Sequence, residues 1–168
     1  MKETKNLVRG AFFLALGLLV PYVFHLFKLA GPVFLPMHIP VLLAGFILGS
    51  KYGLMIGFIC PLLNSVLTGM PPLFPVALGM AFELATYGFI SGYLYKDKKA
   101  NVFVSLVSAM IAGRFILAIA NIILLNLAGK KFVLSAFLTS SFVTGLWGII
   151  IQLILIPIII AIYEKRMN

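Results

Sequence analysis

The chain has 168 residues, of which 62% are hydrophobic and only 10% are charged, and its mean hydropathy is +1.16. This composition leaves too little polar surface for a water-soluble globule, whose apolar content stays near half, so we predict a membrane protein in contact with lipid. The net charge of +9 does not point to nucleic acid, because the basic residues cluster between apolar runs instead of lining one face.

Six apolar segments follow one another along the chain, and a helix needs about 20 mostly apolar residues to cross a bilayer. The second segment, at roughly 15 residues or 22 Å, is expected to stop short of one membrane face. The third contains Pro61, and short or interrupted segments often border the binding site of a transporter. We predict an all-α membrane protein, a six-helix bundle in a single domain (residues 1–168), with helices at approximately residues 6–27, 36–50, 52–68, 74–95, 102–127 and 132–163.

The basic residues predict how this bundle is oriented in the membrane. If the N-terminus is cytoplasmic, the outer loops hold only Lys28, Lys130 and Lys131, whereas the inner loops and tails hold Lys2, Lys5, Arg9, Lys51, Lys96, Lys98, Lys99, Lys165 and Arg166. Loops rich in Lys and Arg stay on the cytoplasmic side. We therefore expect both termini in the cytoplasm, which an even number of spans also requires.

Two ionisable residues fall near the middle of predicted spans, where a charge is costly and usually faces a cavity or a partner. Glu83 belongs to the fourth segment and Arg114 to the fifth, at similar depth, so the two side chains could meet as an ion pair or each could pair with a ligand. Two interpretations stay open. The pair either only locks two helices together, or one or both side chains present charge to a ligand.

Further polar and aromatic residues are biased toward the outer half of the bundle. Asn121 lies two helical turns from Arg114, Tyr87 lies one turn from Glu83, and Asn64 and Trp147 belong to the third and sixth segments. Small-molecule sites are typically apolar pockets with a few fixed polar groups. These residues therefore predict a small pocket that opens to the outside.

His38 stands between Pro36 and Pro40, at the predicted outer lip of the second segment. The prolines are expected to interrupt the helix and to hold the loop extended. The His38 ring then either closes over a ligand or sits at the headgroup level without a partner. A second proline cluster, TGMPPLFP at residues 68–75, is predicted to form the next outer turn, so that the two loops make a lid.

The sequence offers little for catalysis or metal binding. It has no HExxH, GxSxG or GxxxxGK[ST] motif, and three of its four carboxylates, Glu3, Asp97 and Glu164, lie at predicted cytoplasmic ends. The single cysteine, Cys60, excludes an intramolecular disulfide and a Cys/His metal cluster. We expect no enzyme, no catalytic residue, no metal and no cofactor. Transport would be passive, ion-coupled, oligomeric or dependent on other subunits.

Several stretches resemble a known family. Small residues four apart predict close helix contacts, and Ala11 and Ala15 form such a face within AFFLA of the first segment. The strings MHIPVLLAGFILG, KYGLMIGF, PLLNSVLTGMPP and AFELATYGFISG are more specific. Over essentially the whole chain, the sequence resembles the S-components, which are the substrate-binding membrane subunits of energy-coupling factor (ECF) vitamin transporters.

The resemblance implies the S-component fold, a site near the outer side between helices four to six, and a prokaryotic plasma membrane. It also implies that the Ala11 and Ala15 face docks on a transmembrane coupling subunit, which is joined to two ATPase subunits that hydrolyse ATP. The function expected is capture of a small water-soluble vitamin for ATP-driven uptake.

The chemistry of the pocket residues narrows the expected vitamin without fixing it. Arg114 suits a carboxylate or phosphate, and Glu83 suits a protonated nitrogen, an amine or hydroxyls. Tyr87 and Trp147 are expected to stack on a flat ring. A pyridoxine-like compound, a pyrimidine precursor and a pantothenate-like compound all fit this set.

Two other functions are compatible with the sequence. A stand-alone secondary transporter would need neither ATP nor partner subunits for uptake. A membrane assembly protein would bind no soluble ligand, and its polar residues would bond helix to helix.

Overall fold

The computed structural model describes residues 2–27 and 31–167, and within them it is a bundle of helices. Lys28, assigned above to an outer loop, lies outside the described residues. Six helical units are long and apolar enough to cross a membrane, which confirms the predicted six-helix fold. The elements are α1 (Lys2–Leu26), α2 (Gly31–Phe34), α3 (His38–Leu48), α4 (Ser50–Thr68), η1 (Leu73–Ala77), α5 (Leu78–Gly92), η2 (Tyr93–Asp97), α6 (Val102–Leu127), α7 (Leu134–Leu138), η3 (Thr139–Thr144) and α8 (Leu146–Met167).

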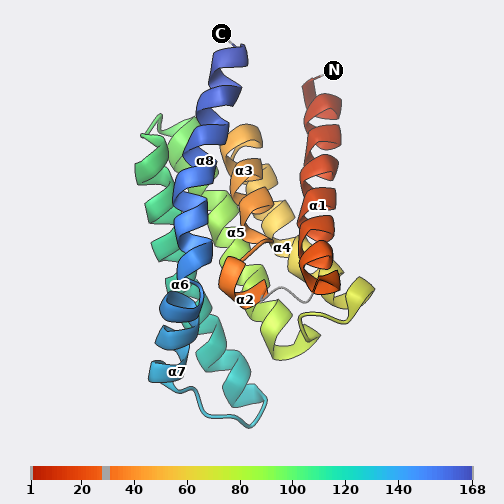
Figure 1. Cartoon of the computed structure of the whole chain (residues 1–168), viewed down its shortest axis with the longest axis vertical. Coiled ribbons are helices and arrows are strands. Elements are labelled where there is room, and N and C mark those ends of the chain that lie inside the picture. Colours follow the sequence, from red (N-terminus) through yellow and green to blue (C-terminus); the bar gives the residue numbers. More distant parts are fainter. Residues whose placement is uncertain (1, 28–30, 168) are drawn as a thin grey trace.

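Both chain ends lie at the same end of the bundle, at the top of Figure 1. The connection from α3 to α4 lies at this end too, whereas α7 and the connection from α4 to α5 lie at the opposite end. The two ends are called here the terminal end and the distal end. Lys96, Lys98 and Lys99 follow α5 at the terminal end, whereas Lys130 and Lys131 lie in the connection from α6 to α7 at the distal end.

Helix α3 forms the centre of the bundle. Its residues from Val41 to Leu48 are all buried, and the helix contains no Asp, Glu, Lys or Arg. A helix that is apolar all round is typical of a protein core or of a membrane span, and here α3 is also enclosed by other helices. At its end, Gly49 adopts a φ of +100°, which favours glycine, and so lets the chain turn directly into α4.

Glycines let helices α3, α4 and α5 approach at backbone contact. A Cβ atom on Gly53 would collide with the carbonyl of Gly88, and one on Gly88 would collide with the carbonyl of Gly53. A Cβ atom on Gly57 would likewise strike the backbone of Leu84. Close backbone packing of this kind holds helices together where lipid gives no hydrophobic drive for their association.

The second span differs from its prediction. It comprises Gly31–Leu48, with α2 and α3 joined through Leu35, Pro36 and Met37, instead of starting at residue 36. Pro40 does not interrupt it, because Pro40 lies in the first turn of α3, where backbone N–H groups have no helical acceptor to bond. His38 is therefore the first residue of a helix instead of part of an extended loop.

The sixth span is also broken where a continuous helix over residues 132–163 was predicted. The short helix α7 and the wide turn η3 precede Gly145, and α8 begins after it. Near the break, the Thr139 hydroxyl donates to the carbonyl of Ser135 at 2.9 Å, and the Ser140 hydroxyl donates to that of Phe137 at 3.0 Å. Such bonds compete with the regular helical ladder and bend helices.

Candidate functional site

A cavity of about 590 Å³ lies among the distal ends of the helices. It is bounded by the last turns of α1, by α2, by the segment after α4 and by η3. Prolines and methionines make up much of its wall, among them Pro21, Pro36, Pro71, Met37, Met70 and Met80. The volume and the apolar wall are typical of a site for a small molecule.

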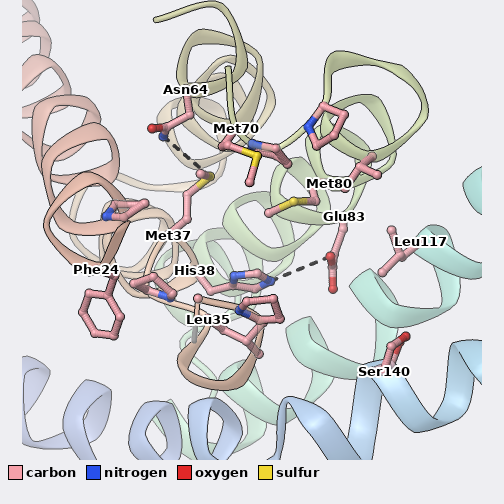
Figure 2. Close-up of a pocket in the computed structure, with 18 of the residues that line it drawn as sticks. Phe24, Leu35, Met37, His38, Asn64, Met70, Met80, Glu83, Leu117 and Ser140 are labelled. Atoms are coloured by element: carbon pink, nitrogen blue, oxygen red, sulfur yellow. Dashed lines mark hydrogen bonds and ion pairs between the residues drawn. The ribbon is translucent and has the colours of Figure 1, made fainter. Parts of the chain in front are cut away.

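A cluster of three ionisable side chains forms the polar part of this cavity. Arg114 Nη1 lies 2.8 Å from Glu83 Oε1, and His38 Nε2 lies 3.7 Å from Glu83 Oε2. The residues Glu83, His38 and Arg114 are only 1%, 2% and 8% exposed. Figure 2 shows His38 and Glu83 pointing toward each other across the cavity wall. Glu83 and Arg114, for which the sequence left open a pair with each other or with a ligand, therefore form an ion pair, and His38 lies next to it.

Neighbouring residues hold these side chains in place. The ring of Tyr87 packs edge-on against the ring of His38, with centroids 5.3 Å apart and an interplanar angle of 70°. A Cβ atom on Gly113 would overlap the Tyr87 ring, so the glycine allows α6 to pack closely on α5 at this point. This packing brings Arg114, the next residue of α6, to the level of Glu83 on α5.

Several polar atoms of the cluster have no hydrogen-bond partner within the part of the chain that the structure describes. They are both ring nitrogens of His38, the Nε and Nη2 atoms of Arg114, and Glu83 Oε1, which makes an ion pair but no hydrogen bond. Buried polar atoms are nearly always hydrogen-bonded, and an unmet donor costs about 1–3 kcal/mol. The Arg114 and His38 atoms belong to residues that line the cavity, so they are candidates for contact with a ligand, whereas the unpartnered Gln152 amide belongs to a residue that is not among those lining it.

Of the other residues expected to bind substrate, Asn64 and Asn121 line the cavity. The Asn64 amide Nδ2 donates to the carbonyl of Gly17 at 3.0 Å, so part of its role is to tie α4 to α1. The Asn121 side chain lies beside Gly79 of α5.

Tyr87 and Trp147 are not among the described residues that line the cavity. Tyr87 is buried behind His38, and Trp147 is 61% exposed on α8. Their expected stacking on a flat ligand ring therefore has no counterpart in this arrangement. His38, in turn, is buried at the cavity instead of lying at the outer lip.

Sequence reasoning did not assign some residues that line the cavity, including Tyr22, Phe24, His25 and Phe137. The proline cluster at residues 68–75 was predicted from the sequence to lie over the pocket. Three of its residues, Met70, Pro71 and Pro72, line the cavity. Residues at the end of α1 gave no comparable signal, since an aromatic residue there is equally typical of a lipid-facing helix end.

Other kinds of site are less well supported. Among residues 2–27 and 31–167, no three His, Cys, Asp or Glu side chains come together to hold a metal ion.

On the outside of the bundle, Ala11 and Ala15 are exposed on one face of α1, next to exposed Phe12 and Leu19. This face of α1 is therefore open to lipid or to another protein.

The six membrane-length helices and the enclosed cavity define a multi-pass membrane protein with a site of small-molecule size. The family model of the ECF transporter substrate-specific component matches residues 5–160, and the chain therefore belongs to this family. It is thus a substrate-specific membrane subunit of an ECF transporter, which works with a small-molecule substrate and with ECF partner subunits. Comparisons with curated proteins and with solved structures gave no significant match.

Proposed function

We propose that this subunit captures a small water-soluble vitamin or vitamin precursor from outside a prokaryotic cell for ATP-driven uptake. A pyridoxine-like compound, a pyrimidine precursor and a pantothenate-like compound are the candidates. The observation that carries the proposal is the cavity of about 590 Å³ with Glu83, Arg114 and His38 fixed in its wall. A pocket that is mostly apolar but has a few immobile polar groups suits a compact ligand of mixed polarity.

The position of the cavity supports capture from outside. The cavity lies at the distal end, away from the termini and from the basic segment Lys96–Lys99. Because basic segments stay on the cytoplasmic side, the distal end is assigned to the outer face of the plasma membrane.

ATP-driven uptake requires partners, since the chain has no nucleotide-binding motif of its own. The proposed partners are a transmembrane coupling subunit and two ATPase subunits. The exposed Ala11 and Ala15 face of α1 supports docking of the coupling subunit, because small side chains let another helix approach closely.

Uptake into proteoliposomes tests this function. The subunit, reconstituted with its coupling and ATPase subunits, is expected to import the compound released from the purified protein only when ATP is supplied. Ala15→Trp is expected to abolish association and uptake while leaving ligand affinity unchanged. Ile111→Trp, on an exposed position of α6, is the matched control. Uptake without ATP or partners, or normal uptake by Ala15→Trp, would contradict the proposal.

A further inference from the structure

We infer that the ligand carries a carboxylate, which binds the Nε and Nη2 edge of Arg114, and that the rest of the molecule packs against the apolar wall. The inference rests on the proposed function and selects one of its ligand classes. It favours an acid over neutral or cationic compounds such as those of the pyridoxine type.

The first argument is the geometry of the guanidinium group. Arg114 uses Nη1 for its ion pair with Glu83, at 2.8 Å, whereas Nε and Nη2 have no partner among the described residues. These two nitrogens are adjacent on one side of the planar group, and their N–H bonds are parallel. A carboxylate presents two oxygens at a matching spacing and accepts both bonds at once. One ligand group therefore satisfies both buried donors.

The second argument is the balance of donors and acceptors. Glu83 is the only carboxylate among the described residues that line the cavity, and it is already paired with Arg114 and close to His38. The unpartnered atoms of the cluster are the Arg114 Nε and Nη2 donors, the two ring nitrogens of His38 and the Glu83 Oε1 acceptor, which makes an ion pair but no hydrogen bond. A ligand that supplies acceptors satisfies the two Arg114 donors, whereas a cationic ligand would compete with Arg114 for Glu83.

The third argument separates a carboxylate from a phosphate. No lysine is found among the described residues that line the cavity, and Glu83 offsets the charge of Arg114. A buried charge needs compensating charge and hydrogen bonds. Because Glu83 already offsets Arg114, a bound anion adds charge to this cluster, and a carboxylate adds one negative charge where a phosphate dianion adds two.

The fourth argument concerns the body of the ligand. Tyr87 and Trp147, the aromatic residues expected to stack on a flat ring, are not among the described lining residues. The wall instead presents Met37, Met70 and Met80, whose side chains adapt to irregular apolar shapes. Contact with the body is thus chiefly apolar, and the carboxylate gives the ligand its orientation.

Matched acid and neutral probes test this inference on the purified protein. The pairs are pantothenate with panthenol, biotin with biotinamide, and nicotinate with nicotinamide, with binding measured by equilibrium dialysis in detergent. In at least one pair, the acid is expected to bind at least about tenfold more tightly, because only the acid offers a charged acceptor to the two Arg114 donors. In Arg114→Lys, which keeps the charge beside Glu83 but lacks the Nε and Nη2 edge, the preference should be lost.

Compounds released by denaturing the protein provide the second readout, read by mass spectrometry. If no probe binds, a released carboxylic acid supports the inference, and a released neutral or cationic compound overturns it. Equal binding of acid and neutral partner, or an unchanged preference in Arg114→Lys, also overturns it while leaving the proposed function standing. If no probe binds and no small molecule is released, both the inference and the proposed function fail.

Discussion

The buried pair of Glu83 and Arg114 makes a quantitative prediction about stability. The two groups are 2.8 Å apart, and at an effective dielectric constant of about 20 their Coulomb attraction is about 6 kcal/mol. Desolvation of both charges offsets much of this attraction. Removing one partner, however, leaves the other buried and unpaired, which typically costs about 3–5 kcal/mol.

A double-mutant cycle measures this coupling. Glu83→Gln and Arg114→Gln are each expected to lower the free energy of unfolding by about 3–5 kcal/mol, and the double variant by clearly less than the sum. The assay is SDS-induced unfolding in mixed micelles, followed by circular dichroism. Additive effects of the two substitutions would refute the reasoning, because they would mean that the two side chains do not stabilise each other.

The same double variant decides between the two interpretations of the pair. With two neutral amides in place of the charges, the helices can remain joined by a hydrogen bond. If the pair also presents charge to a ligand, the double variant folds but loses affinity for the compound released from the wild-type protein. Unchanged affinity would mean that the pair serves only to hold α5 and α6 together.

Three further predictions follow from the packing. Gly88→Ala is expected to destabilise the bundle by about 1–3 kcal/mol or more, because its Cβ would collide with α4, whereas Gly10→Ala, with 3.5 Å to the nearest side-chain atom, should be tolerated; equal unfolding midpoints would contradict this. Trp147→Phe should leave the dissociation constant of the released compound unchanged, since Trp147 is exposed; a tenfold loss would place it in the site. Maleimide labelling of the fully buried Cys60 should be slow until the protein unfolds, and rapid labelling of folded protein would show that α1 separates from α4.

The spans and the charge pair were accessible to sequence reasoning for a physical reason. Twenty-residue apolar segments have few alternatives to spanning helices, and a buried carboxylate and guanidinium at the same depth have a strong reason to meet. Glu83 and Arg114 could therefore be paired without knowing which face of each helix is inside.

The placement of His38 and Trp147 depends on details that spacing does not reveal. A proline three residues after a non-helical residue can belong to an extended loop or to the first turn of a helix, and Pro40 takes the second position. The interruption at Gly145 resets the helical phase before α8. The face on which Trp147 lies therefore cannot be carried over from the residues that precede the interruption.

The amount of small molecule released from the purified protein is the most direct measure of whether this cavity holds a ligand. Denaturation followed by mass spectrometry should release about one compound per chain from the wild-type protein and from Ile111→Trp, whose substitution faces outward. Met80→Trp, which puts a bulkier side chain into the cavity wall, should release none. Equal release from Met80→Trp and the wild type would mean that the ligand binds elsewhere, and no release from any of the three would contradict a ligand-binding role for the cavity.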